Sequence, residues 1–171
     1  VLERLRQENS WWATGQVDEE YAFLPKRQYY DLLFPLIRDI VTRRAAVLMG
    51  QKRVGKTVMV HQTIDSLLKK GVSPHQIAYV SFENPMFRKF KLRELFDICK
   101  DGTGQKDSNG WYVIFDSIEY QKDWEHQLES LVDSFSGSKF VAVASANLSQ
   151  NLNESGYGRF STVWIPALTF Y

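Results

Sequence analysis

The chain has 171 residues and a formal net charge of +1; 44% of its residues are hydrophobic and 24% are charged. These are values of a globular protein, and the length fits one domain with a full core, so global disorder is excluded. The small net charge excludes a strong overall positive field of the kind that binds nucleic acid. No apolar run approaches the roughly 20 residues of a membrane helix, and the first residues do not resemble a signal peptide, so we expect a cytoplasmic protein with no membrane partner.

Residues 1–44 mix polar and aromatic stretches and are predicted to form an extension packed on the rest of the chain. A helix is predicted over residues 28–41, and Pro35 either kinks it or begins a second helix. The adjacent Trp11 and Trp12 point in different directions. Two interpretations stay open for them, packing in the core and lining an adenine site.

From residue 45 onward, short apolar runs alternate with amphipathic stretches. Strands are predicted over residues 45–49, 77–82, 111–115, 140–144 and 162–165. Helices are predicted over 57–70, from Leu92 to Cys99, and after Asp123, which we expect to cap its helix; residues 101–110 are predicted to be a loop. This alternation predicts an α/β fold with three layers, α/β/α, around a parallel five-stranded sheet.

The first strand leads directly into the sequence GQKRVGKT at residues 50–57. This is the G-x-x-x-x-G-K-[ST] pattern of a P-loop, in the strand-to-helix context that the pattern requires. Its glycines allow a tight turn that points backbone N–H groups at phosphate oxygens, and the following helix N-terminus adds positive charge. We therefore predict a P-loop NTPase that binds ATP through Gly50, Gln51, Lys52, Arg53, Val54, Gly55, Lys56, Thr57 and Val58.

A magnesium site is predicted beside this loop. The Thr57 hydroxyl is one expected ligand of Mg²⁺, and Lys56 is expected to reach the β- and γ-phosphates. Asp116 ends the apolar strand over residues 111–115, which is the position from which a carboxylate reaches a metal-bound water. ATP and Mg²⁺ are thus the predicted cofactors.

Hydrolysis also needs a group that orients the attacking water. Many P-loop ATPases place a glutamate directly after the metal aspartate, but this chain has Ser117 there. Glu119 and Glu83 are the two acids that could replace it, and Glu83 ends the second predicted strand. Ser145, at the end of the fourth, is a candidate sensor of the γ-phosphate, and Arg159 is a candidate arginine finger for its own or a neighbouring subunit.

Other conspicuous residues carry weaker predictions. Cys99 is predicted to be a buried, reduced packing residue, and the three scattered histidines predict no zinc site. The segment over residues 87–93 (FRKFKLR) alternates aromatic and basic side chains. It fits either an amphipathic helix start or a surface for a nucleic acid or protein partner.

Several stretches together resemble a family of ATPases of the AAA+ superfamily from bacteria and archaea. They are QENSWW, GQKRVGKT, YVSFENP, WYVIFDSIEYQKDWEHQLESL, KFVAVASANLS and GYGRFSTVWIPALTF. The resemblance implies an ATPase core over residues 45–171. Family chains run on past the equivalent of Tyr171 into a further C-terminal domain, so we expect this sequence to be the ATPase core without that domain. The family usually has Asp-Glu-Ile-Gln where this chain has Asp116, Ser117, Ile118 and Glu119.

Two functions therefore stay open. One is a Mg²⁺-dependent ATPase, capable of self-association, that drives a conformational change. The other is a nucleotide-binding switch that hydrolyses ATP weakly because Ser117 replaces the usual glutamate. A small-molecule kinase would need an arginine-rich lid that the sequence lacks, and a nucleic-acid motor would rest on residues 87–93 alone.

Overall fold

A computed structural model describes residues 1–26, 28–52, 54–145 and 158–166. Its centre is a five-stranded parallel sheet in the order β2-β3-β4-β1-β5. The strands are β1 (Ala45–Gly50), β2 (Ile77–Ser81), β3 (Tyr112–Asp116), β4 (Lys139–Ser145) and β5 (Phe160–Ile165). All five were predicted, with boundaries that differ by one or two residues. The α/β class and the parallel sheet are confirmed.

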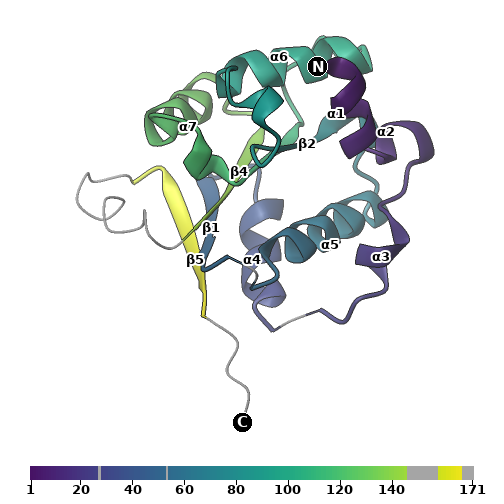
Figure 1. Cartoon of the computed structure of the whole chain (residues 1–171), viewed down its shortest axis with the longest axis vertical. Coiled ribbons are helices and arrows are strands. Elements are labelled where there is room, and N and C mark those ends of the chain that lie inside the picture. Colours follow the sequence, from purple (N-terminus) through teal and green to yellow (C-terminus); the bar gives the residue numbers. More distant parts are fainter. Residues whose placement is uncertain (27, 53, 146–157, 167–171) are drawn as a thin grey trace.

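Helices cover both faces of this sheet (Figure 1). On one face lie α1 (Leu2–Glu8), α6 (Leu92–Thr103) and α7 (Trp124–Ser134); on the other lie α3 (Glu19–Ala22), α4 (Tyr30–Arg38) and α5 (Lys56–Lys69). The short helix α2 (Trp11–Thr14) and the 3₁₀ turns η1 (Pro74–Gln76), η2 (Pro85–Phe87) and η3 (Ile118–Tyr120) lie in the connections. Three layers are thus present, as the alternation of strands and helices predicted.

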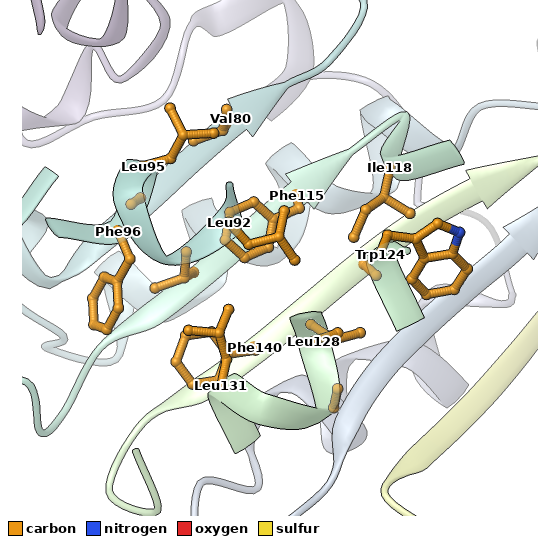
Figure 2. Close-up of a cluster of buried hydrophobic side chains, with 14 of the residues drawn as sticks. Val80, Leu92, Leu95, Phe96, Phe115, Ile118, Trp124, Leu128, Leu131 and Phe140 are labelled. Atoms are coloured by element: carbon orange, nitrogen blue, oxygen red, sulfur yellow. The ribbon is translucent and has the colours of Figure 1, made fainter. Parts of the chain in front are cut away.

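Each layer boundary has its own apolar core. Beneath α6 and α7, the Phe96 ring meets the Phe140 ring edge to face at a centroid distance of 5.6 Å (Figure 2). The Trp111 ring meets Phe96 in the same way, at 5.5 Å. Leu5 of α1 belongs to the same core. On the other face, Leu33 of α4 and Ile64 of α5 are fully buried. Strand β1 is buried along its whole length between the two cores, which explains its continuous apolar sequence.

Three local predictions need correction or refinement. Residues 101–103 continue α6, which ends at Gly104 with a φ of 73°, so the loop is shorter than predicted. Asp123 occupies the N-cap position of α7 but its side chain makes no capping hydrogen bond. Pro35 lies inside the single helix α4, so no second helix begins there. Within the described ranges, no helix is both long and apolar enough to span a bilayer.

Candidate nucleotide-binding site

The loop between β1 and α5 has the backbone that the predicted phosphate site requires. Gly55 is the N-cap of α5 and has a φ of 92°, a conformation that favours glycine. At Gly50, an added Cβ would lie 3.0 Å from the Ile165 carbonyl oxygen and 3.1 Å from a Val54 methyl group. Both positions therefore favour glycine, and the loop opens onto the N-terminus of a 14-residue helix.

Lys56 folds back over this loop. Its Nζ donates hydrogen bonds to the carbonyl oxygens of Gly50 and Gln51, the second at 2.9 Å. Burial lowers the pKa of the ammonium, and the negative charges of Glu119 and Asp116 act in the opposite direction. The side chain is thus held at the loop, at the place where the pattern predicts a contact with phosphate.

Asp116 lies at the carboxyl end of β3 and is only 4% exposed. Its Oδ2 accepts hydrogen bonds from Thr57 Oγ1 at 2.8 Å and from the Tyr79 hydroxyl at 2.5 Å, and its Oδ1 accepts one from the Ser117 N–H at 2.8 Å. Burial and the Asp116 charge raise the pKa of Tyr79 well above its usual 10, so this hydroxyl remains a donor. Two residues predicted as metal ligands are therefore in direct contact.

This donor set fits Mg²⁺. The ion prefers oxygen ligands, keeps several waters and is commonly held by one or two protein groups together with substrate phosphates. Thr57 and Asp116 provide a hydroxyl and a carboxylate oxygen 2.8 Å apart. Within the described residues, no group of three or more His, Cys, Asp or Glu side chains could hold a metal ion. A magnesium ion at this site would therefore need the phosphates of a bound nucleotide as further ligands.

A cleft of about 440 Å³ opens above these residues, at the carboxyl edge of the sheet. The predicted sensor Ser145 lines it, and Ser145 Oγ donates a hydrogen bond of 2.8 Å to Glu119 Oε1. Glu83 also lines the cleft, but its side chain is exposed. The complete lining is Lys52, Gly55, Lys56, Thr57, Val58, Glu83, Asp116, Ser117, Glu119, Tyr120, Val143, Ala144 and Ser145.

Arg159 lies elsewhere. It precedes β5, and its carbonyl accepts a hydrogen bond from the N–H of Ala45, the first residue of β1. The phosphate loop begins at the other end of β1, about 16 Å away at roughly 3.3 Å per residue. The guanidinium pairs with Asp133 instead. A finger role in its own site is therefore not supported, and a role in a neighbouring subunit stays a prediction. Arg53 lies outside the described residues.

The basic segment over residues 87–93 is partly committed to the fold. Phe87 is fully buried. The Arg88 guanidinium lies 3.9 Å from the centre of the Tyr120 ring, and its Nε donates a hydrogen bond of 2.7 Å to the Phe82 carbonyl. These contacts bring the segment beside the cleft and favour a structural role for its first two residues.

Residues 8–12 have a structural role that the sequence did not reveal. Strand β2 is an edge of the sheet, and side chains from this segment pair with its outward-facing backbone. Asn9 accepts a hydrogen bond from the Tyr79 N–H at 2.6 Å and donates one to the Tyr79 carbonyl at 2.9 Å; Trp11 and Trp12 both donate to the Ile77 carbonyl, at 2.9 and 2.7 Å. The two tryptophans thus lie at the amino end of β2, where the strand is farthest from the phosphate loop.

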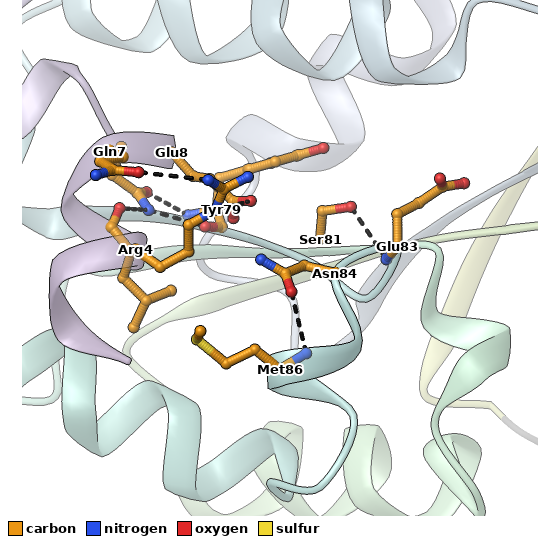
Figure 3. A network of polar contacts seen from close by, with 10 residues as sticks. Arg4, Gln7, Glu8, Tyr79, Ser81, Glu83, Asn84 and Met86 are labelled. Atoms are coloured by element: carbon orange, nitrogen blue, oxygen red, sulfur yellow. Dashed lines mark hydrogen bonds and ion pairs between the residues drawn. The ribbon is translucent and has the colours of Figure 1, made fainter.

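Glu8 precedes these residues and forms an ion pair with Arg4 at 3.5 Å, and burial raises its pKa (Figure 3). The segment QENSWW therefore covers the outer edge of strand β2 with side-chain hydrogen bonds. Its only signal in the sequence was the unusual density of polar and aromatic side chains.

Comparisons with known proteins agree with this geometry. A family described as an AAA domain matches residues 42–171. The chain belongs to this AAA domain family. An uncharacterised protein of Haemophilus influenzae is 26% identical to it over 125 residues, which cover 72% of this chain and 31% of that protein.

Two solved structures resemble this AAA domain. One is a DNA replication initiation factor, with a TM-score of 0.53 and 13% identity, covering 87% of this chain and 50% of that one. The other is AMPPCP-bound DnaA from Aquifex aeolicus, with a TM-score of 0.50 and 13% identity, covering 87% and 51%. At such identities the likeness concerns the fold alone. The chain spans 31% of the curated relative and about half of these solved chains.

Proposed function

We propose that this AAA domain binds ATP with Mg²⁺ and hydrolyses it. The observation that carries the proposal is the contact between Thr57 Oγ1 and Asp116 Oδ2, which joins the phosphate loop to the end of β3 at 2.8 Å. Membership of the AAA domain family and the lysine held at the loop support it. The nucleotide phosphates would lie on the loop N–H groups, and Lys56 would exchange its carbonyl partners for phosphate oxygens.

Thr57 and Asp116 would hold the magnesium ion, which, when bound, neutralises charge on the β- and γ-phosphates. The protein's own residues then have three tasks. The loop orients the phosphate chain, Lys56 adds positive charge, and Tyr79 and the Ser117 N–H fix the Asp116 carboxylate by hydrogen bonds. These tasks are positioning and electrostatic stabilisation, which account for most of phosphoryl-transfer catalysis.

A nucleotide-binding switch is the second candidate, and Ser117 favours it. This residue stands where many P-loop ATPases have their glutamate, and its φ of 54° is a conformation in which a non-glycine side chain is strained. In such a switch, ATP would bind and change the conformation with little turnover.

Binding and turnover measured side by side test the proposal. We expect the chain to bind a fluorescent ATP analogue in the presence of Mg²⁺, and Lys56→Ala to weaken that binding at least about tenfold, or 1.4 kcal/mol. We also expect phosphate release above the rate of Lys56→Ala. Equal rates for the two proteins would exclude the ATPase, and binding without turnover would leave the switch. In that case Ser117→Glu should raise turnover.

The remaining assignments are part of the same proposal. Residues 1–44 are proposed to be an extension of the core over residues 45–171. Ser145 is proposed as the γ-phosphate sensor, and Arg159 as a finger toward a neighbouring subunit, which would require self-association. A cytoplasmic location is proposed on the composition alone.

A further inference from the structure

The site lacks the glutamate that usually follows the metal aspartate, and we propose that Glu119 is the catalytic carboxylate that orients and deprotonates the attacking water. This inference rests on the proposed ATPase function. It assigns the task to a residue three positions beyond Asp116 instead of the position held by Ser117.

The local backbone explains how Glu119 reaches the site. Ser117 takes a left-handed conformation, with φ 54° and ψ 43°, and the chain turns at once into η3. This turn packs against β4, so Glu119 meets the end of the neighbouring strand. There its Oε1 accepts the hydrogen bond from Ser145 Oγ. The reversal at Ser117 thus carries the next acid back over the cleft.

One oxygen of the Glu119 carboxylate accepts a hydrogen bond, and the other has no partner among the described residues. This second oxygen, Oε2, is buried. A buried carboxylate oxygen without a partner is costly, so a polar partner at Oε2 would stabilise this carboxylate. The hydrogen bond from Ser145 holds the orientation of the carboxylate, and the unpartnered Oε2 is the oxygen that we assign to the attacking water.

The charge of Glu119 also acts on the lysine of the phosphate loop. Among the charges that act on the Lys56 ammonium, Glu119 has a larger effect than Asp116. Lys56 and Glu119 line the same cleft, and Lys56 is where the β- and γ-phosphates are expected. Glu83, the other candidate, lines the same cleft but is exposed, which favours a solvated carboxylate.

The step balances with water as the only co-reactant. The water oxygen forms a bond to the γ-phosphorus while its proton passes to Glu119 Oε2. The bond between the γ-phosphorus and the β–γ bridging oxygen breaks, and its electron pair leaves with ADP. Glu119 then returns the proton to the phosphate product or to solvent, which restores the carboxylate.

Glu119→Gln is the decisive variant, because the amide keeps an oxygen that can accept from Ser145 and removes the basic oxygen. We expect turnover to fall about 100-fold or more, as for loss of a general base, while affinity for a fluorescent ATP analogue changes less than about threefold. Nucleotide recovered from the protein after incubation with ATP should remain ATP. The rival assignment is tested with Glu83→Gln, which would show this loss instead if Glu83 were the base. The matched control is Glu3→Gln, an exposed acid of α1, which should keep turnover within about threefold of the native rate and yield ADP.

Each alternative outcome is distinct. Native-like turnover in Glu119→Gln, or a large loss confined to Glu83→Gln, would overturn the assignment and leave the ATPase proposal intact. Loss of nucleotide binding together with turnover in Glu119→Gln would make Glu119 a binding residue and overturn it too. If the native chain releases no more phosphate than Lys56→Ala, the ATPase proposal itself fails, and Glu119 has no catalytic task.

Discussion

Asn9 offers a test of how the edge of the sheet is held. Its side chain is fully buried and makes three hydrogen bonds, to the Leu5 carbonyl at 2.7 Å, the Tyr79 carbonyl at 2.9 Å and the Tyr79 N–H at 2.6 Å. In Asn9→Ala, the Leu5 carbonyl keeps a bond from the Asn9 backbone N–H. The Tyr79 backbone groups lose the amide that pairs with them.

The expected loss of stability follows from that count. An unsatisfied buried backbone group costs about 1–3 kcal/mol, so two groups, partly relieved by relaxation, should lower the free energy of unfolding by about 3 kcal/mol. Urea denaturation followed by circular dichroism measures this change, and the slope with denaturant should stay constant. Asn84→Ala is the matched control, because that side chain caps η2 by accepting from the Met86 N–H and should cost only about 1 kcal/mol. If Asn9→Ala costs no more than Asn84→Ala, the closure of the β2 edge by Asn9 contributes little.

Three further predictions concern single residues. Because burial raises the pKa of Glu8 above its usual 4.5, ionisation of Glu8 weakens the fold as the pH rises through the folded pKa. The stability of Glu8→Gln relative to the native chain should therefore be greater at pH 7 than at pH 4. Urea denaturation at the two pH values measures this difference, and the opposite trend would refute the prediction. Ser117→Gly should raise the free energy of unfolding by about 0.5–1 kcal/mol because glycine accepts the φ of 54°. The control Ser130→Gly, on the exposed face of helix α7, should lower the free energy of unfolding by about as much. Equal losses in the two variants would contradict backbone strain at Ser117. Burial raises the pKa of the Cys99 thiol to about 12. A disulfide reagent at pH 8 should therefore modify the native chain slowly and the urea-unfolded chain promptly. Prompt modification of both would show that the thiol is accessible in the native chain.

The sequence was sufficient for most of the fold because the fold has strong periodic signals. Five apolar runs became five strands, of which β5 is only partly buried. The helices between them kept their predicted apolar faces, as Leu92, Leu95, Phe96 and Cys99 of α6 illustrate. Boundaries were less predictable. Residues 101–103 contain a glycine and two polar residues, which have weak helix propensity, yet α6 continues through them to Gly104.

The candidate site was predictable where neighbours in sequence are neighbours in space. The loop at residues 50–57 is such a case, and the parallel order of the strands placed Asp116 beside it. Contacts between side chains of distant segments were not predictable. The bond between Ser145 and Glu119 depends on the turn at Ser117, and the position of Arg159 depends on the register of β5 with β1, in which Ala45 pairs with Phe160. Neither has a signature in composition or spacing.

The pairing of β2 with residues 8–12 bears on where this nucleotide-binding unit begins. The family match starts at residue 42, yet the backbone groups of Ile77 and Tyr79 find their outer partners more than thirty residues before it. A shorter chain that started at the family boundary would expose an unprotected strand, the kind of surface from which proteins polymerise edge to edge. For this chain, the unit recognised by sequence similarity is smaller than the unit that covers the β2 edge of the sheet.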